Sequence, residues 1–427
     1  MELAGSVEET ASRRGAGYQT LLVGLLSLNF GILFFDRNAL NFLMPFVKPS
    51  LGLSNTQVGL TASALSFSWA LAALAVGAAA DRTGRRKMFL IACTIAFSLC
   101  SFLTGLAQSF VMLFAARLLM GTVEGGVAPV SQTMIASAVP HARRGLAMGV
   151  MQNFCSNLLG SFAAPVLLVW FASTLGWHRA FFLAGIPGLI SALLLWKFVD
   201  EPDAPPPRER NPLLAHVGEL LANRNLVVCL LLSVLLVSYL VVCWAFMPLF
   251  LTKMRGFAPT TMSWLIGSLG ISATIGSFAI AGLSDRIGRK PVMIATAFLG
   301  VVLPLGAMFF TGSVWVLAAI FALGWTLTGI FPLFMAAVPS ESVAPQHVTT
   351  AMALVMGVGE VLGGVFSPTL AGWAADANGL TAPLWIMIGL CIAAGLLALI
   401  LRETAPAAIL TTTSRPQGVV ALRDADR

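Results

Sequence analysis

The segment FFDRNALNF (Phe34–Phe42) places the opposite charges of Asp36 and Arg37 side by side within a long apolar run. The meaning of that pair depends on the solvent around the run. Of the 427 residues, 58% are hydrophobic and only 10% are charged, whereas a soluble domain carries roughly 25% charged residues. The outer surface must therefore face lipid, where a charge at mid-depth costs roughly 2.5 kcal/mol or more.

Apolar runs of the length of a membrane span recur along the chain. About 20 apolar residues cross the hydrocarbon core as a helix, so the sequence has room for roughly twelve spans. The first set covers residues 20–46, 57–80, 88–107, 110–139, 145–171 and 180–196, and the second covers residues 225–251, 260–283, 291–311, 313–338, 348–374 and 379–401. The sequence therefore predicts an all-α integral membrane protein with twelve transmembrane helices.

One interior segment, residues 200–224, has the composition of a linker, because it is long, charged and rich in proline. It separates the two sets of six helices, and we therefore expect two six-helix bundles joined by a cytoplasmic linker. The expected boundaries are an N-terminal tail at 1–19, bundles at 20–199 and 225–402, and a C-terminal tail at 403–427.

The positions of Lys and Arg predict the orientation in the membrane, because these residues are enriched in cytoplasmic loops. With a cytoplasmic N-terminus, 19 of the 25 Lys and Arg residues fall in inner loops, the linker or the tails. Both termini are thus expected in the cytoplasm, with the protein in the cell inner membrane. The net charge of +7 then reflects basic loops, and nucleic acid is not an expected partner.

A charged loop occurs twice, once after the second helix of each half. It reads GAAADRTGRRK (Gly77–Lys87) in the first half and GLSDRIGRK (Gly282–Lys290) in the second. The repeat indicates pseudo-symmetric bundles and resembles the signature of the major facilitator superfamily, in which two six-helix halves rock about a central cavity. The candidate charge-pairing or gating residues in these loops are Asp81, Arg82, Arg85, Asp285, Arg286 and Arg289.

Five charged residues lie inside the predicted spans: Asp36, Arg37, Arg117, Glu124 and Glu360. Four of them belong to the first and fourth helices. Arg117 and Glu124 are seven residues apart, so they share one face of a helix. A buried structural pair, such as Asp36 with Arg117, would explain part of this set, but two acids and two bases exceed what helix packing needs.

The chemistry of this set suits proton-coupled uptake of an organic acid. A carboxyl group held away from water can bind a proton near neutral pH, and a guanidinium stays charged and presents a fork that matches a carboxylate. Asp36 and Glu124 are the candidate proton-coupling acids, and their spacing leaves open which one carries the proton. Arg37 is the candidate contact for the substrate anion.

Two further helices offer polar side chains to a central pocket. In MQNFCSNLLG (Met151–Gly160), Gln152 is the candidate ligand contact, with interhelical hydrogen bonding as the alternative role. Glu360 is a candidate pocket residue or second protonation site, and otherwise has a packing or gating role. The six cysteines and four histidines form no ligand-like cluster, so no metal site, catalytic residue or cofactor is expected, and the driving force would be a proton gradient.

The Asp36–Arg37 pair, RLLMGTVEGGVAP (Arg117–Pro129) and GWHRAFFLAGIPG (Gly176–Gly188) resemble the anion:cation symporter family, which includes sialin and the vesicular glutamate transporters. The resemblance implies proton coupling by the acids at Asp36 and Glu124. It also implies carboxylate binding at Arg37, charge pairing at Arg117 and a polar contact at Gln152.

Two departures from that family bear on the substrate. Phe34 stands where sugar-acid members carry an aromatic hydroxyl, and the segment GIFPLF (Gly329–Phe334) is apolar. The pocket is therefore expected to suit a small carboxylate with few hydroxyl groups, aromatic ones included, with sugar acids as the alternative. A drug or lipid antiporter is a rival interpretation. The sequence shows no hydrolase, metalloprotease or nucleotide-binding motif, so we expect a monomeric transporter in lipid and no enzyme.

Overall fold

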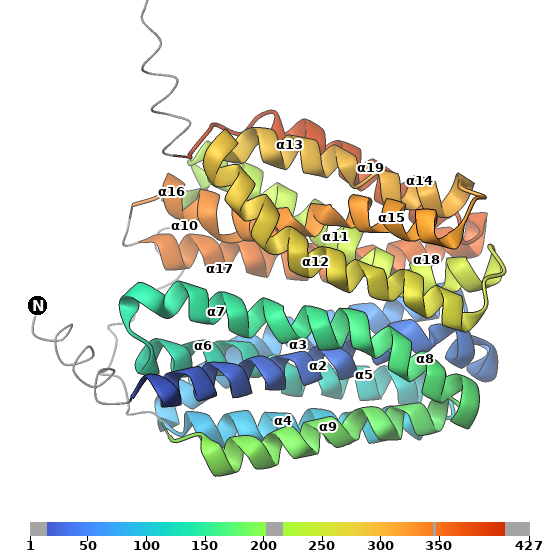
Figure 1. Cartoon of the computed structure of the whole chain (residues 1–427), viewed down its shortest axis with the longest axis horizontal. Coiled ribbons are helices and arrows are strands. Elements are labelled where there is room, and N and C mark those ends of the chain that lie inside the picture. The colour runs from blue at the N-terminus through green and yellow to red at the C-terminus, as the bar shows by residue number, and fades with distance from the viewer. Residues whose placement is uncertain (1–14, 202–216, 345–346, 406–427) are drawn as a thin grey trace, which may run out of the picture.

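The computed structural model describes residues 15–201, 217–344 and 347–405, and these residues form helices and connections without a strand. Figure 1 shows two layers of helices. The first layer consists of α2 (Ala16–Leu51), α3 (Asn55–Thr83), α4 (Arg86–Gly105), α5 (Phe110–Glu124), α6 (Val127–Ala138), α7 (His141–Cys155), the π-helical η1 (Ser156–Ala163), α8 (Ala164–Leu175) and α9 (Trp177–Phe198).

The second layer repeats this pattern of long and interrupted helices. It consists of α11 (Arg224–Lys253), α12 (Pro259–Ile287), α13 (Arg289–Leu299), α14 (Val302–Phe309), α15 (Val314–Trp325), the 3₁₀-helical η2 (Thr326–Ile330), the π-helical η3 (Leu333–Ala337), α16 (Val338–Ser342), α17 (Val348–Val358), the π-helical η5 (Gly359–Phe366), α18 (Ser367–Asn378) and α19 (Ala382–Ala398). Consecutive pieces such as α7, η1 and α8 form one interrupted span.

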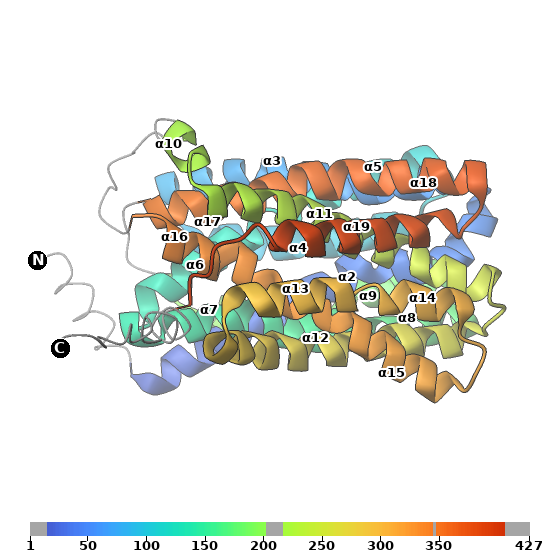
Figure 2. The same cartoon turned by 90° about the horizontal axis from the view of Figure 1, so that it is seen from above.

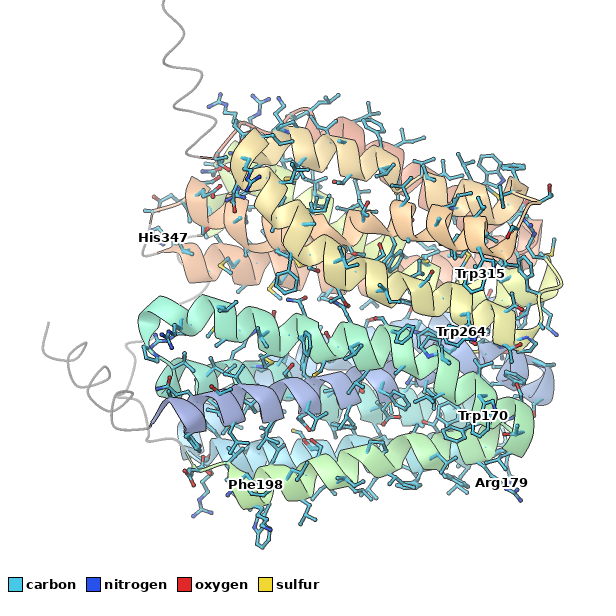
Figure 3. The ribbon with its side chains drawn as sticks, viewed as in Figure 1. Trp170, Arg179, Phe198, Trp264, Trp315 and His347 are labelled. Atoms are coloured by element: carbon cyan, nitrogen blue, oxygen red, sulfur yellow. The ribbon has the colours of Figure 1, made fainter. Side chains whose placement is uncertain are left out.

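Ten spans in the described part of the chain are long and apolar enough to cross a membrane. Together with α3 and the shorter α19, they give the twelve-helix arrangement expected from the sequence. Exposed tryptophans support a lipid environment, since Trp170, Trp264 and Trp315 lie toward one end of the molecule (Figure 3), as in the aromatic belt of membrane proteins.

The start of α2 and the end of α19 lie at one end of the molecule, together with the short α10 (Val217–Leu221) (Figure 2). We call this the terminal end, and we call the opposite end, where α2 ends and α3 begins, the far end. The helix α10 lies within the segment predicted as a linker. Residues 202–216 of that linker and nearly all of both predicted tails lie outside the described residues. The first helix begins at Ala16, four residues before the predicted boundary at residue 20.

Candidate functional site

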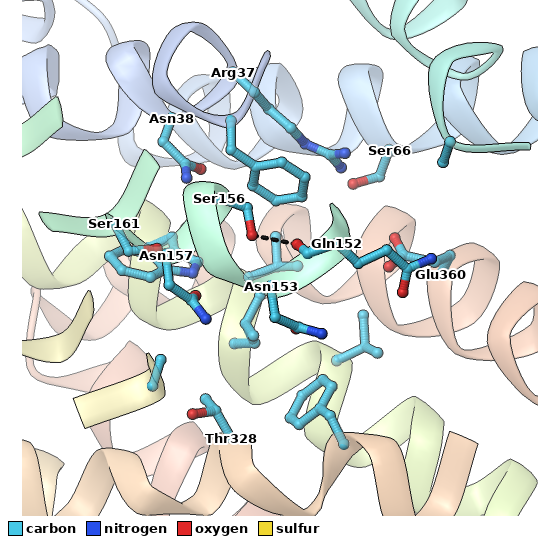
Figure 4. Close-up of a pocket in the computed structure, with 18 of the residues that line it drawn as sticks. Arg37, Asn38, Ser66, Gln152, Asn153, Ser156, Asn157, Ser161, Thr328 and Glu360 are labelled. Atoms are coloured by element: carbon cyan, nitrogen blue, oxygen red, sulfur yellow. Dashed lines mark hydrogen bonds between the residues drawn. The ribbon is translucent and has the colours of Figure 1, made fainter. Parts of the chain in front are cut away.

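A cavity of about 340 Å³ lies between the two layers and is lined by residues of both. From the first layer, α2, α3, α5, α6 and the interrupted span of α7 and η1 contribute side chains. From the second layer, the contributions come from α11, α12, the interrupted span from α15 to η3, and the span of α17 and η5. Three charged residues line this cavity: Arg37, Arg117 and Glu360. Figure 4 shows the Arg37 side chain extending from α2 into this space.

Arg37 presents a cation that is held by aromatic faces. Its guanidinium carbon lies 5.6 Å from the ring centre of Phe34 and 5.4 Å from that of Trp69, within the range of cation–π attraction. Its Nε lies 4.0 Å from Oε2 of Glu124, too far for a hydrogen bond. The guanidinium makes no hydrogen bond to another described residue, so its donors remain available to an anion in the cavity.

Glu124 lies behind Arg37 and is fully buried. It ends α5, where Gly125 and Gly126 separate this helix from α6. Neither carboxylate oxygen has a hydrogen-bond partner among the described residues. An ionised carboxylate without such partners is costly to bury, so the charge of Arg37 is what can offset it. The geometry therefore links the charge state of Glu124 to the guanidinium that faces the cavity.

Asp36 points away from the cavity, into the interior of the first layer. It is fully buried and accepts a hydrogen bond of 2.5 Å from the Ser101 hydroxyl of α4. Its other oxygen has no partner in the part of the chain that the structure describes. Asp36 and Arg37 are neighbours in sequence, but successive side chains of a helix point about 100° apart, and this rotation separates the two charges.

Arg117 departs from the expected charge pairing. Its Nη2 donates a 2.8 Å hydrogen bond to the backbone carbonyl of Arg37, and its Nη1 lies 3.0 Å from the sulfur of Met120. It forms no ion pair with a described acid in this conformation. Arg117 therefore fixes the backbone that carries Arg37, which sequence reasoning did not foresee.

The predicted ligand contact Gln152 does line the cavity, together with the amides of Asn153 and Asn157 on the same span. The Ser156 hydroxyl donates to the Gln152 carbonyl (Figure 4). The helix changes to π geometry at Ser156, and π-helical turns often occur at functional sites. Asn157 lies within this π-helical segment, whereas Gln152 and Asn153 lie in α7 just before it.

Glu360 faces the cavity from the second layer. It lies in the π-helical η5, and its carboxylate makes no ion pair or hydrogen bond with any of the residues described. Arg37 lines the same cavity from the first layer. Figure 4 shows Glu360 and Gln152 on the same side of the pocket. The prediction that Glu360 is a pocket residue thus agrees with its position.

The repeated loops lie at the terminal end. In the second half, Asp285 and Arg289 form an ion pair of 2.5 Å, and Arg289 also reaches Glu341 at 2.9 Å. Arg286 is exposed, as is Arg85 in the first half. The side chains of Asp81 and Arg82, also predicted to pair charges, lie outside those that the structure describes.

Two acids that sequence reasoning missed cap the helices after these loops. Glu403 accepts hydrogen bonds from the backbone amides of Arg289 and Lys290 at 2.8 and 3.1 Å, and Glu201 accepts one from the amide of Lys87 at 2.9 Å. The first turn of a helix leaves such amides without partners and favours a negative charge. The recurrence of an acid just after the sixth and twelfth spans was the available signal.

The two layers are joined at the far end. Asp376 of α18 accepts hydrogen bonds of 2.8 Å from the amides of Asn55 and Thr56 and of 2.6 Å from the Thr56 hydroxyl. Nearby, the hydroxyls of Ser63 and Thr369 lie 2.7 Å apart. These four side-chain hydrogen bonds between described residues of the two layers all lie at the far end. The structure is therefore the conformation in which that end is closed.

Glycine permits this closure. Gly59 of α3 lies against the backbone carbonyl of Pro368, and Gly372 of α18 lies against that of Asn55. A Cβ at either glycine would overlap the facing backbone, so a larger residue would hold the helices apart. The layers also meet where α12 packs against η1. A Cβ on Gly270 of α12 would lie 2.6 Å from the amide nitrogen of Phe162 in η1, so close packing that depends on glycine occurs at both contacts between the layers.

We expect Asp376→Ala to shift the protein toward a conformation that is open at the far end, because three hydrogen bonds between the layers are lost. Spin labels introduced by Gln108→Cys and Thr311→Cys, at exposed positions of the far end, would report the separation of the layers by double electron–electron resonance. A longer distance population is expected in the variant. Thr369→Val, which removes one hydrogen bond, should have a smaller effect, and identical distributions in all three proteins would refute the closing role.

The match to a known family decides which kind of protein carries this cavity. The sequence model of the Major Facilitator Superfamily matches residues 26–254 and 239–425. The chain belongs to this superfamily. The family membership confirms the superfamily resemblance of the repeated loop and identifies the protein as a transporter and not an enzyme.

Several curated proteins are similar over most of their length. The chain is 27% identical to a probable 4-methylmuconolactone transporter of Cupriavidus pinatubonensis, over 77% of this chain and 78% of that protein. It is 27% identical to a gallate transporter of Pseudomonas putida, over 90% and 92% of the two chains, and 24% identical to a D-galactonate transporter of Escherichia coli, over 90% and 95%.

A solved structure with the same fold is a bacterial homologue of the human lysosomal transporter Spinster in an inward-facing, unoccupied conformation. It has 19% sequence identity and a TM-score of 0.69, over 93% of this chain and 98% of that one. At this identity the likeness concerns the fold alone. The fold and the named relatives together agree with a multi-pass membrane transporter of the superfamily.

Proposed function

We propose that the protein is a proton-coupled symporter that takes up a small organic anion by alternating access. The observation that carries the proposal is the free guanidinium of Arg37 inside the cavity, 4.0 Å from the buried carboxylate of Glu124. An anion at Arg37 and a negative charge on Glu124 compete for one cation. Protonation of Glu124 would release Arg37 to bind the carboxylate of the substrate, so that proton and anion move together.

The shape of the cavity favours a carboxylate with few hydroxyl groups. Phe34 and Trp69 face Arg37, and Trp244, Trp325 and Phe331 add aromatic surface from the other layer. The relatives named for gallate and 4-methylmuconolactone support an acid with a ring. The relative named for D-galactonate supports a sugar acid, which stays the second candidate because Gln152, Asn153 and Asn157 could bind its hydroxyls.

The orientation completes the proposal. With the termini in the cytoplasm of a cell whose inner membrane holds the protein, the far end faces outward, and its closure makes this conformation inward-facing. Transport would need one monomer, protons and lipid, with no cofactor beyond the proton gradient. Asp36, held by Ser101 in the interior of the first layer, would act as a second acid that senses the charge of Arg117 and Glu124.

Uptake by purified protein in proteoliposomes tests this function. We expect labelled aromatic or short aliphatic carboxylates to accumulate when the lumen is alkaline relative to the outside, and sugar acids to accumulate less. Empty liposomes and proteoliposomes without a pH gradient are the controls. A substrate that accumulates equally well without the gradient would exclude proton coupling, and a preference for hexonates or hexuronates would establish the sugar-acid candidate.

A further inference from the structure

Glu360 contributes a second charge to the cavity that binding of a simple anion at Arg37 does not use. Among the described residues that line the cavity, it has the only carboxylate. It comes from η5 in the second layer, whereas Arg37 comes from α2 in the first. The binding site thus has a positive pole and a negative pole on opposite layers of the molecule.

The two poles do not neutralise each other directly. Arg37 and Glu360 form no ion pair within 4.0 Å in the described structure, although both line the same cavity. A ligand between them can therefore contact both. Since burying a charge without a partner is costly, a ligand that offers a donor to Glu360 is favoured over one that does not.

The surroundings of Glu360 leave its carboxylate accessible. A Cβ on Gly364 would lie 3.3 Å from Oε2 of Glu360 and 3.1 Å from the Ser66 hydroxyl oxygen, so the absence of a side chain at this glycine leaves room at the carboxylate. Ser66 and Gln152 also line the cavity nearby (Figure 4). Aromatic residues such as Trp244 and Phe331 also line the cavity and suit a flat apolar body.

We propose that Glu360 selects aromatic carboxylates that carry a hydrogen-bond donor, such as a ring hydroxyl, at the end away from the carboxylate. This inference rests on the proposed function, because it assigns the substrate carboxylate to Arg37. A hydroxyl donates to the Glu360 carboxylate, whereas a second carboxylate at that end is repelled by it. The site therefore accepts hydroxylated monoacids and rejects aromatic diacids.

Binding to purified protein in detergent tests the selection with matched probes. The probes are benzoate, 3- and 4-hydroxybenzoate, isophthalate and terephthalate, and affinities are measured by isothermal titration calorimetry. A hydrogen bond to a charged group contributes roughly 1.5–3 kcal/mol, so we expect wild type to prefer the better hydroxybenzoate over benzoate by about tenfold or more. The diacids should bind more weakly than benzoate.

The variant Glu360→Gln keeps the shape of the side chain and removes its charge. We expect two affinity ratios to move toward one in this variant: that of hydroxybenzoate to benzoate and that of benzoate to the diacid. Glu360→Asp, which keeps the charge, should still reject the diacid. Thermal unfolding and gel-filtration profiles establish that the variants are folded. Ratios in Glu360→Gln that match wild type, or a wild type that does not discriminate among the probes, would overturn the inference.

The same titrations separate this inference from the proposed function. If wild type binds benzoate and Arg37→Lys does not, the assignment of the anion site to Arg37 is supported. The relative affinities of the probes in wild type and in the Glu360 variants then decide whether Glu360 selects the substrate. If wild type binds none of these acids nor short aliphatic or sugar acids, the proposed function fails, and the selection by Glu360 fails with it.

Discussion

Replacing Arg37 by lysine is expected to weaken organic-anion binding by about 10- to 100-fold, although the positive charge is retained, because charge-assisted hydrogen bonds contribute roughly 1.5–3 kcal/mol. An ammonium is a compact point charge that cannot offer the planar fork of a guanidinium. It also stacks less well between Phe34 and Trp69, whose ring centres lie 5.6 and 5.4 Å from the Arg37 guanidinium carbon. The affinity would be measured by calorimetry and the transport rate in proteoliposomes.

A matched control is Arg179→Lys, since Arg179 is exposed at the far end, away from the cavity (Figure 3). It should transport like wild type. Retained wild-type affinity and uptake in a folded Arg37→Lys variant would show that the carboxylate binds elsewhere. The assignment of the anion site would then be wrong, whatever the substrate.

Replacing Glu124 by glutamine is expected to abolish accumulation driven by a proton gradient. The amide resembles the protonated carboxyl and cannot change its charge. Glu124 is fully buried, and both of its carboxylate oxygens lack a hydrogen-bond partner among the described residues. The charge of Arg37 is therefore the principal interaction that offsets the cost of burying an ionised Glu124. In the variant Arg37 stays permanently available, so exchange of substrate across the membrane, which needs no net proton movement, should partly survive.

Uptake against a concentration gradient and counterflow, measured in the same vesicles, separate these two activities. Asp36→Asn is the necessary comparison, because the two acids can titrate as a coupled system. Glu219→Gln, exposed on α10 at the terminal end, is a control that should keep both activities. A Glu124→Gln protein that still concentrates substrate like wild type would make Glu124 structural and transfer the coupling role to Asp36.

The fold was predictable from the sequence because lipid restricts the solutions. In a bilayer the backbone must satisfy its hydrogen bonds within the protein, and apolar runs of about 20 residues do so as helices. The repeated loops indicated two halves. The positions of the breaks within the spans were harder to predict from the sequence. The π-helical η1 and η5 and the 3₁₀-helical η2 follow from packing between helices, and no residue pattern in these segments distinguishes them from ordinary helix.

The site was predictable as a set of charges but not as an arrangement. Asp36 and Arg37 are neighbours in sequence, but the structure places the Asp36 carboxylate against Ser101 within the first layer and the Arg37 guanidinium in the cavity. The helical rotation of about 100° per residue could have predicted this. The Trp69 contact with Arg37 and the hydrogen bond from Arg117 to the Arg37 carbonyl depend on the packing of three helices, which the sequence does not specify.

The most direct test of the central claim, that anion and proton move together through this cavity, is the pH of the lumen during uptake. Proteoliposomes with a trapped pH-sensitive dye, made without an imposed gradient, would receive an organic acid that the protein binds. We expect the lumen to acidify in wild type as substrate enters, and Glu124→Gln to abolish this acidification. Entry of substrate into wild-type vesicles with no change in lumen pH would contradict this claim.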